Sequence, residues 1–406
     1  MLNKLFKFEK GATLNLSTFF FLYIAQSIPM SFFSTAIQVI MREAEFSYSS
    51  IALMQIVKLP WVLKFIWAPL IDRNCISLKD YKRAIISSEV VYALLLIVVG
   101  LLNVADDFFL IISLIILSLI ASATQDIATD SLAVLSFKNK DKNMVNSMQS
   151  MGSFGGVIIG SGVLLMVLNK YGWNAVVHCL AGFVLIALLP LLFNRKLQIE
   201  QKQVKQRAKF TDFIWFFNQR KIWKQIGFLM LYYASTIGLL SVLRPYLVDL
   251  GYSKSEIGVL FGVVGSAAAF VSSFCSGLIV RRIGIYSARI IFAIFALITA
   301  LYFWAISWTP TTVLITLGII LLWVGYGMST IVVYTSSMNS VREGREGTDF
   351  TVQTVLTHFS GIIIALLSGK VADNMGVHSM FGFEVILAVI SLIYILLIFK
   401  KEKSNG

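Results

Sequence analysis

Hydrophobic stretches long enough to cross a lipid bilayer fill almost the whole of this 406-residue chain. A helix rises about 1.5 Å per residue and therefore needs roughly 20 apolar residues to span a hydrocarbon core of about 30 Å. The sequence predicts an all-α membrane protein with twelve transmembrane helices. These spans lie near residues 15–41, 49–71, 84–103, 108–135, 145–168, 173–193, 224–249, 255–280, 286–306, 311–337, 351–372 and 379–399.

The positions of the positive charges indicate the orientation of the chain. If the N-terminus is inside, nearly all Lys and Arg outside the spans fall in the two tails and in the loops after spans 2, 4, 6, 8 and 10. Only Arg42, Lys170 and Lys254 lie in loops on the other side. The positive-inside rule therefore predicts that both the N- and the C-terminus of this multi-pass protein are cytoplasmic. The net charge of +13 is a topology signal, and no nucleic-acid partner is expected.

Several other classes of protein lack support in the sequence. The first span is much longer than the apolar region of a cleavable signal peptide. The three cysteines, Cys75, Cys179 and Cys275, form neither a disulfide framework nor a metal-ligand cluster. No P-loop and no H-E-x-x-H motif occurs. We therefore expect no enzyme activity, no cofactor and no metal.

The chain divides into two similar halves, 1–193 and 224–406, joined by a polar cytoplasmic linker at 194–223. Span 1 contains Y-I-A-Q-S-I-P from Tyr23, and span 7 contains Y-Y-A-S-T-I-G from Tyr232. Span 5 contains F-G-G-V-I-I-G-S-G from Phe154, and span 11 contains F-S-G-I-I-I from Phe359, followed by Ser-Gly. Matches six helices apart indicate a parallel repeat. Such folds place the substrate between the halves and work by alternating access.

Small residues recur every fourth position on two spans. They are Gly152, Gly156 and Gly160 on span 5, and Gly258, Gly262 and Ser266 on span 8. Small residues allow helix backbones to approach closely in a membrane. The pattern fits static helix packing and a mobile interface between the halves equally well.

Ionisable residues inside the spans are the first candidates for function, because each costs about 2.5–3.5 kcal/mol to insert. Asp126 and Asp130 are four residues apart on span 4, so their carboxylates share one helical face. Repulsion between them could make one a proton carrier. The alternative is that both only form salt bridges near the cytoplasmic end. Lys64, in the cytoplasmic half of span 2, is the expected ion-pair partner of Asp126 or Asp130.

Other polar residues are candidates for gating or for a substrate cavity. Charges after span 2, and at the matching place after span 8, are positioned to form ion pairs that break as the cytoplasmic face opens; ordinary positive-inside charge is the alternative. These gating candidates are Asp72, Arg73, Arg83, Arg281 and Arg282. The cavity candidates are Lys58, Gln26, Gln55, Gln125, Gln149, Arg244, Tyr334 and Gln353. Arg244 could recognise an anionic group, although it could equally snorkel to the membrane surface.

The layout resembles the major facilitator superfamily, with its two parallel six-helix halves. Two segments, L-P-W-V-L-K-F-I-W-A-P-L-I-D-R ending at Arg73 and Q-D-I-A-T-D-S-L-A starting at Gln125, resemble its peptide–acetyl-coenzyme A transporter branch. That branch includes AmpG-like muropeptide permeases and related siderophore permeases. The residues after Asp130, Leu132 to Ser136, lack the Arg and the acidic residue that muropeptide permeases often carry there. Both solute classes therefore stay open.

The resemblance implies a secondary active transporter, a proton-coupled symporter that imports anhydromuropeptides for cell-wall recycling. The siderophore permease is the alternative on the same scaffold. A non-transporting membrane receptor or signalling scaffold is the alternative of another class. The expected partners are a small-molecule solute, protons and the lipid bilayer, and we expect the protein to function as a monomer.

Overall fold

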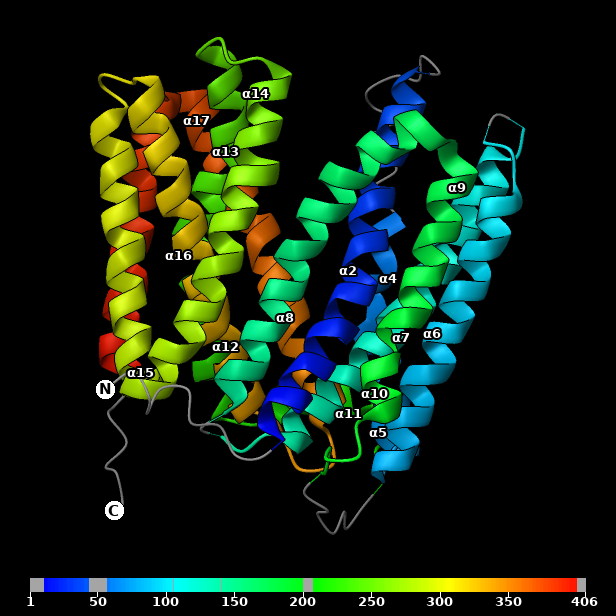
Figure 1. Cartoon of the computed structure of the whole chain (residues 1–406). Coiled ribbons are helices and arrows are strands. Elements are labelled where there is room, and N and C mark those ends of the chain that lie inside the picture. The colour runs from blue at the N-terminus through cyan, green and yellow to red at the C-terminus, as the bar shows by residue number, and fades with distance from the viewer. Residues whose placement is uncertain (1–10, 44–56, 105, 140, 200–206, 400–406) are drawn as a thin grey trace. The chain divides into compact units, whose positions relative to one another are not determined.

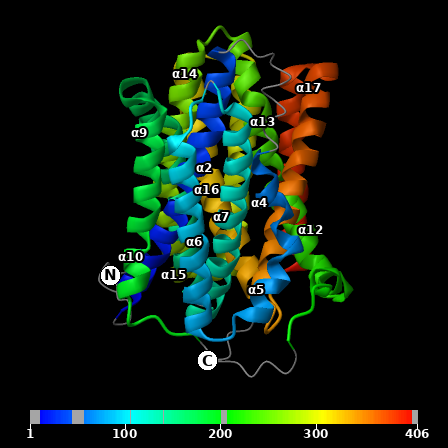
Figure 2. The ribbon, with the colours of Figure 1, turned by 90° about the vertical axis from the view of Figure 1, so that its right-hand side faces the viewer.

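The computed structural model describes residues 11–43, 57–104, 106–139, 141–199 and 207–399, and every regular element among them is helical (Figures 1 and 2). The longer helices are α2 (Ala12–Glu43), α6 (Leu78–Leu101), α7 (Phe108–Ser136), α8 (Lys142–Val157), α9 (Leu164–Ala187), α12 (Ile222–Tyr232), α13 (Ala234–Asp249), α15 (Ser266–Ile306), α16 (Thr312–Asn339) and α17 (Glu346–Ile398). The shorter ones are α4 (Leu59–Leu63), η2 (Lys64–Ile66), α5 (Ala68–Asn74), η3 (Ile158–Val163), α10 (Leu189–Phe193), α11 (Asp212–Trp215), η4 (Phe216–Asn218), α14 (Lys254–Gly258) and η5 (Val259–Gly265).

Eight helical segments of the described chain are long and apolar enough to cross a membrane. Three of them, Lys142–Phe193, Ser255–Ile306 and Glu346–Ile398, have 52 or 53 residues. Each contains one glycine with a positive φ: 78° at Gly172, 80° at Gly284 and 82° at Gly376. Glycine adopts this conformation without steric penalty, so each glycine joins two helical arms. These turns fall between the predicted spans 5 and 6, 8 and 9, and 11 and 12.

The second predicted span, 49–71, lies partly outside the described residues. Its described part is broken into α4, η2 and α5, and a proline stands in the first turn of both α4 and α5. Proline fits the first turn of a helix but cannot continue a preceding one. The all-helical membrane fold is confirmed, whereas the count of twelve spans and the cytoplasmic termini stay predictions.

The helices group into two compact units. The first unit contains residues 1–138, 151–215 and 341–351, and the second contains residues 139–150, 216–340 and 352–406. The boundary at 215/216 falls inside the predicted linker. Two short segments, 139–150 and 341–351, group with the unit formed mainly by the other half of the sequence. The predicted domain limits of 1–193, 194–223 and 224–406 stay a prediction.

In the first unit, α6 packs against α7 and α9, and α2 lies beside η3, α7 and α9. The core between them is aromatic and aliphatic, with Phe32, Phe33 and Trp173 in contact. Gly152 and Gly156 lie directly against α2: a Cβ atom at Gly152 would stand 2.8 Å from the Cβ of Tyr23. The small-residue stripe of span 5 therefore serves packing within one unit.

In the second unit, α15 packs along α16, and α12 and α13 lie against this pair. One apolar cluster surrounds Phe303 and Phe381, and another surrounds Phe228 and Phe292. Gly258 and Gly262, the start of the second small-residue stripe, have open space where a Cβ atom would stand. That stripe does not repeat the close packing of the first one.

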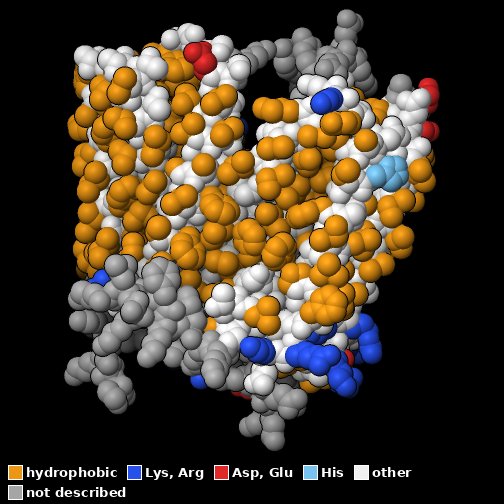
Figure 3. Space-filling model, viewed as in Figure 1, with side chains coloured by type: hydrophobic (Ala, Val, Ile, Leu, Met, Phe, Trp, Pro, Cys, Tyr) orange, Lys and Arg blue, Asp and Glu red, His pale blue; other side chains and the backbone are white. Residues whose placement is uncertain are grey.

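The surface agrees with a lipid environment. Hydrophobic side chains cover the outward helix faces along their length (Figure 3). Large apolar residues such as Phe109 and Leu397 are 78% and 72% exposed. Lys and Arg side chains gather at the end of the first unit that carries α5 and α10 (Figure 3). An exposed apolar surface of this extent would aggregate in water, so the molecule is a multi-pass membrane protein.

Candidate functional site

A buried carboxylate on α7, that of Asp126, is held from two sides. Lys64 on η2 forms an ion pair with its Oδ2 atom, and Gln26 on α2 donates from Nε2 to Oδ1 at 2.7 Å. All three side chains are buried. A charge inside an apolar region is tolerated when it is paired and hydrogen-bonded. The predicted pairing of Lys64 with a span 4 carboxylate is confirmed, and Asp126 is its partner.

A second buried carboxylate, that of Asp130, lies one helical turn further along α7. The hydroxyl of Tyr23 on α2 donates to its Oδ1 atom at 2.8 Å. Tyr23 and Gln26 are three residues apart, so one face of α2 presents both donors to the two carboxylates. We call Tyr23, Gln26, Lys64, Asp126 and Asp130 the charge cluster. It holds two carboxyl groups and one lysine.

A third buried carboxylate, that of Asp72 at the end of α5, caps the start of α17. It accepts hydrogen bonds from the backbone N–H of Gly347 at 2.9 Å and of Thr348 at 2.7 Å, and from the Thr348 hydroxyl at 2.6 Å. The first N–H groups of a helix have no partner within it and attract negative charge. We call these three residues the Asp72 cap. Its carboxylate therefore binds a helix N-terminus, where the sequence predicted an ion pair.

The environment of Asp72 alters its titration. Burial raises the pKa of the Asp72 carboxyl from 3.8 to about 7, although the hydrogen bonds from Thr348 and Gly347 oppose this shift. Desolvation penalises the charged form of any carboxyl that leaves water. The Asp72 cap therefore changes its charge near neutral pH.

Two ion pairs brace the loop before α17. The Arg342 guanidinium binds the Asp349 carboxylate at two points, 2.6 and 2.9 Å, and its Nη2 also donates to the backbone oxygen of Asp212 at 2.8 Å. Arg345 forms an ion pair with the Asp212 side chain. Bidentate arginine contacts fix orientation as well as charge. The segment 341–351 is thus tied to the rest of the first unit at two aspartates, Asp72 and Asp212, while the Arg342–Asp349 pair braces the segment internally.

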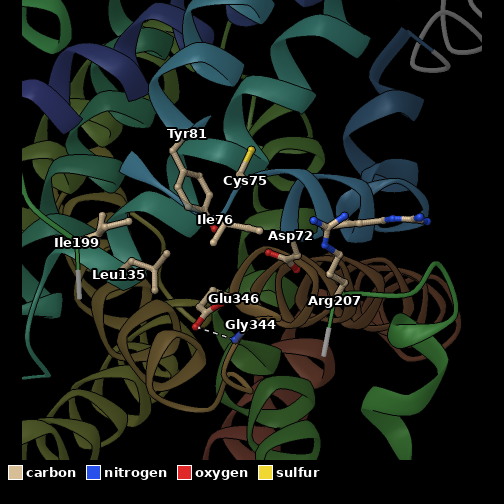
Figure 4. A pocket seen from close by; sticks show the side chains of 10 residues that line it. Asp72, Cys75, Ile76, Tyr81, Leu135, Ile199, Arg207, Gly344 and Glu346 are labelled. Atoms are coloured by element: carbon tan, nitrogen blue, oxygen red, sulfur yellow. Dashed lines mark hydrogen bonds between the residues drawn. The ribbon is translucent and has the colours of Figure 1, made fainter. Parts of the chain in front are cut away.

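A cavity of about 180 Å³ lies beside the Asp72 cap (Figure 4). Asp72 and Glu346 line it together with Arg207 and Cys75, and Glu346 also accepts from the Gly344 N–H. Burial raises the pKa of the Cys75 thiol to about 12, so the thiol stays protonated and is a poor nucleophile. The cavity is small and is lined by the ends of α5 and α7, the starts of α6 and α17, and neighbouring loop residues.

The other predicted gating residues have different surroundings. Arg73 and Arg83 are exposed and form no ion pair within the described part of the chain. Arg281 forms an ion pair of 3.2 Å with Asp141 in the second unit. Arg282 is exposed. Asp72 and Arg281 therefore make the kind of breakable polar contact that gating requires.

The start of α8 is held by a polar network in the second unit. Asn143 donates to the backbone oxygen of Gly277, and Ser147 donates to that of Ser273 at 3.0 Å. Lys142 donates to the oxygen of Met338, in the last turn of α16, at 3.1 Å. A cation is favourable at a helix C-terminus. The sequence did not single out these residues, because amides and hydroxyls carry no distinctive signal.

The predicted cavity residues are dispersed over both units. Gln353 is buried, donates to the oxygen of Ser337 and accepts from Gln225, both at 3.1 Å. Gln125 is buried and donates to the Thr129 hydroxyl at 3.0 Å. Arg244 is exposed and lies 4.9 Å from the ring centre of Phe261. The remaining candidates are Lys58 and Tyr334, both half-buried, Gln149, which is buried, and Gln55, which lies outside the described residues.

Two further buried carboxyl groups were not predicted as functional residues. Glu89 on α6 and Glu384 on α17 are 1% and 0% exposed. Both lie inside predicted spans, so the rule that selected Asp126 and Asp130 would have found them. Among the described residues, no group of three His, Cys, Asp or Glu side chains is arranged to hold a metal ion.

Comparison with known proteins identifies the class. The model of the family described as Major Facilitator Superfamily matches residues 17–365, and the chain belongs to that superfamily. It is therefore a membrane transporter, a class that moves small-molecule solutes and is generally not enzymatic.

Within this class the chain is similar to AmpG-type permeases. It is 20% identical to the "Anhydromuropeptide permease" of Escherichia coli K12 over 379 residues, 92% of this chain and 77% of that protein. It is 23% identical to the "Putative transporter AmpG 4" of Rickettsia felis over 406 residues, 94% and 96% of the two chains. The solved E. coli fucose:proton symporter FucP shares the fold, with a TM-score of 0.69, 16% identity and coverage of 96% and 98%.

Proposed function

We propose that this protein is a proton-coupled importer of anhydromuropeptides that works by alternating access in the inner membrane. The observation that carries the proposal is the charge cluster, in which the Lys64–Asp126 ion pair and Asp130 lie buried in a membrane protein. A purely structural bundle has no use for three ionisable groups that are each costly to insert.

The composition of the charge cluster supports proton coupling. Lys64 can compensate one carboxylate, and Asp126 engages it directly. If both Asp126 and Asp130 were ionised, the cluster with its one lysine would carry a net charge of −1. A proton that binds and leaves at this second carboxyl would change the net charge of the cluster by one. Asp126 and Asp130 are therefore the proposed proton-binding pair.

The names of the relatives support the solute. The chain resembles an anhydromuropeptide permease and an AmpG-type transporter over more than nine-tenths of its length. Neither name mentions a siderophore. An anhydromuropeptide is a sizeable polar solute, and buried amides such as that of Gln26 are the proposed groups that hydrogen-bond to it.

The Asp72 cap and the Arg281–Asp141 pair are the proposed gates at the predicted cytoplasmic end. Each of these polar contacts holds a short segment, 341–351 or 139–150, to the unit formed mainly by the other half of the sequence. Such contacts can break when water reaches them, because water replaces the lost partners. Arg73, Arg83 and Arg282 are exposed and stay proposed gating residues.

The test is uptake of labelled anhydromuropeptide by cells that lack their own permease and express this chain, with and without a protonophore. We expect uptake that collapses with the protonophore and in Asp126→Asn and Asp130→Asn. Asp106→Asn, the same change at an exposed loop carboxylate, should transport normally. No uptake from protein shown to be folded in the membrane would reject the muropeptide and favour ferric siderophores. Full uptake in a triple variant neutralising Lys64, Asp126 and Asp130 would contradict the role of the charge cluster.

A further inference from the structure

A carboxyl group in the second unit, that of Glu384, lies where three spans meet. Glu384 is on the second arm of α17, and its Oε1 atom accepts a hydrogen bond of 2.5 Å from Ser368 on the first arm. Gly238 on α13 faces the same carboxyl group, because a Cβ atom at this position would collide with both of its oxygen atoms. The carboxyl group thus fills the space that a glycine leaves between predicted spans 7, 11 and 12.

Two of these residues belong to the repeated segments of the sequence. Gly238 ends the span 7 segment that starts at Tyr232, and Ser368 belongs to the Ser-Gly pair of span 11. The matching serine of span 5, Ser161, donates to the backbone oxygen of Ser31 at 3.0 Å and accepts from the Thr35 hydroxyl at 2.8 Å. The matching serine of the first unit thus bonds to a neutral backbone oxygen and a neutral hydroxyl. The second unit has an ionisable group instead.

No ion pair to Glu384 is found among the described residues. Arg244 on α13 and Lys370 on α17 are exposed, and His378, the nearest ionisable residue on the same arm, bonds to the Ser307 hydroxyl at 2.6 Å. The Oε2 atom of Glu384 has no hydrogen-bond partner in the part of the chain that the structure describes, and the side chain is 0% exposed. A carboxylate that is buried and has no neighbouring cation is strongly disfavoured in a membrane interior. The packed arrangement of these three spans therefore accommodates the neutral acid.

The depth of Glu384 differs from that of the charge cluster. Glu384 lies about two helical turns beyond Gly376, or about 12 Å along the helix axis. By the predicted topology the turn at Gly376 is on the outer side of the membrane. Protons that drive import enter from that side. Glu384 is therefore nearer to the source of protons than Lys64, which the topology places in the cytoplasmic half.

We infer that Glu384 is a second proton-binding site, which accepts a proton from the outer side when spans 7, 11 and 12 separate and retains it while they are packed. This inference rests on the proposed proton coupling. The charged form favours separated helices that admit water, and the neutral form favours the packed helices seen here. When the protonated form of a group favours one conformation and its charged form favours the other, proton binding is coupled to the conformational change.

The transport test compares accumulation with exchange. In Glu384→Gln, a permanently neutral variant that can still accept from Ser368, accumulation against a gradient should fall about tenfold, because one coupling proton driven by a potential of about 60 mV supplies a factor of that size. Exchange of external for internal labelled solute needs no net proton movement and should persist. Asp373→Asn, an exposed carboxylate on the same helix, is the matched control. Accumulation equal to that of the wild type in Glu384→Gln would overturn the inference.

A second measurement does not depend on the solute. The infrared spectrum of purified protein at neutral pH should contain the carbonyl band of a protonated carboxyl that Glu384→Gln removes and Ser368→Ala shifts in frequency. The absence of such a band would overturn the inference even if import is confirmed. If the wild type shows no protonophore-sensitive uptake but the band is present, the proposed function fails while Glu384 remains a buried proton-binding group.

Discussion

The Tyr23 hydroxyl donates a hydrogen bond of 2.8 Å to the Asp130 carboxylate, although the two residues are 107 positions apart in the chain. Tyr23 thereby holds the second carboxyl group of the charge cluster in place. Loss of this donor in Tyr23→Phe should cost about 1 kcal/mol of stability and should shift the pH profile of uptake. Tyr394→Phe removes a hydroxyl that donates to a backbone oxygen at 2.9 Å far from the cluster in sequence, and should leave the profile unchanged. If the pH profile of uptake were unchanged in both variants, the Tyr23 hydroxyl would have no role in proton-coupled transport.

Breaking the Lys64–Asp126 pair from either side should abolish accumulation. Lys64→Ala leaves a buried carboxylate without its cation, and Asp126→Ala leaves a buried lysine, each at a cost of about 3–5 kcal/mol. Thermal unfolding in detergent and uptake in cells measure the two effects. The exchanged variant Lys64→Asp with Asp126→Lys should recover part of the lost stability. No recovery at all would indicate that the surroundings, including Gln26, accept only one orientation of the pair.

The stability of the protein should depend on pH through Asp72. The pKa of this carboxyl is about 7 in the structure and 3.8 for the free group. The folded state therefore binds the proton more tightly, so the contribution of Asp72 to stability is fully present below pH 3.8 and is lost as the pH rises to about 7. The difference in melting temperature between wild type and Asp72→Asn should change across this interval and become constant above it. A difference that is independent of pH would show that the titration of Asp72 is not linked to folding.

Gly152 should tolerate no larger side chain. In Gly152→Ala the new Cβ would lie 2.8 Å from the Cβ of Tyr23 and 3.0 Å from the backbone nitrogen of Ile24, so α2 must shift. Overpacking of this kind costs about 1–3 kcal/mol. Gly162→Ala, on the same span, meets no atom within 4 Å and should change stability by less than about 0.5 kcal/mol. Equal melting temperatures for the two variants would contradict the close packing of α2 on span 5.

The sequence alone was sufficient for the membrane class, the helical fold and three of the buried ionisable residues. Long apolar stretches in a bilayer usually fold as transmembrane helices. Charged residues are rare within such stretches, which is why Lys64, Asp126 and Asp130 stand out. The repeat also identified Ser368 and Gly238 as members of matched segments. The repeat did not show that both residues lie against Glu384, because nothing in the sequence of a serine or a glycine identifies the residue that packs on it.

The tertiary structure decided which groups meet. The choice of Asp126 over Asp130 as the partner of Lys64 depends on how α4, η2 and α2 pack around α7, and a four-residue spacing cannot distinguish the two carboxylates. Asp72 binds two backbone N–H groups at the start of α17. Every residue except proline has such a group, so the sequence does not mark these two as partners of Asp72. Composition and hydrophobic periodicity show that the chain lies in a membrane and where its helices run, because both are properties of short stretches of sequence. The contacts of Asp72, Asp126 and Glu384 join residues far apart in sequence, so only the packed helices specify them.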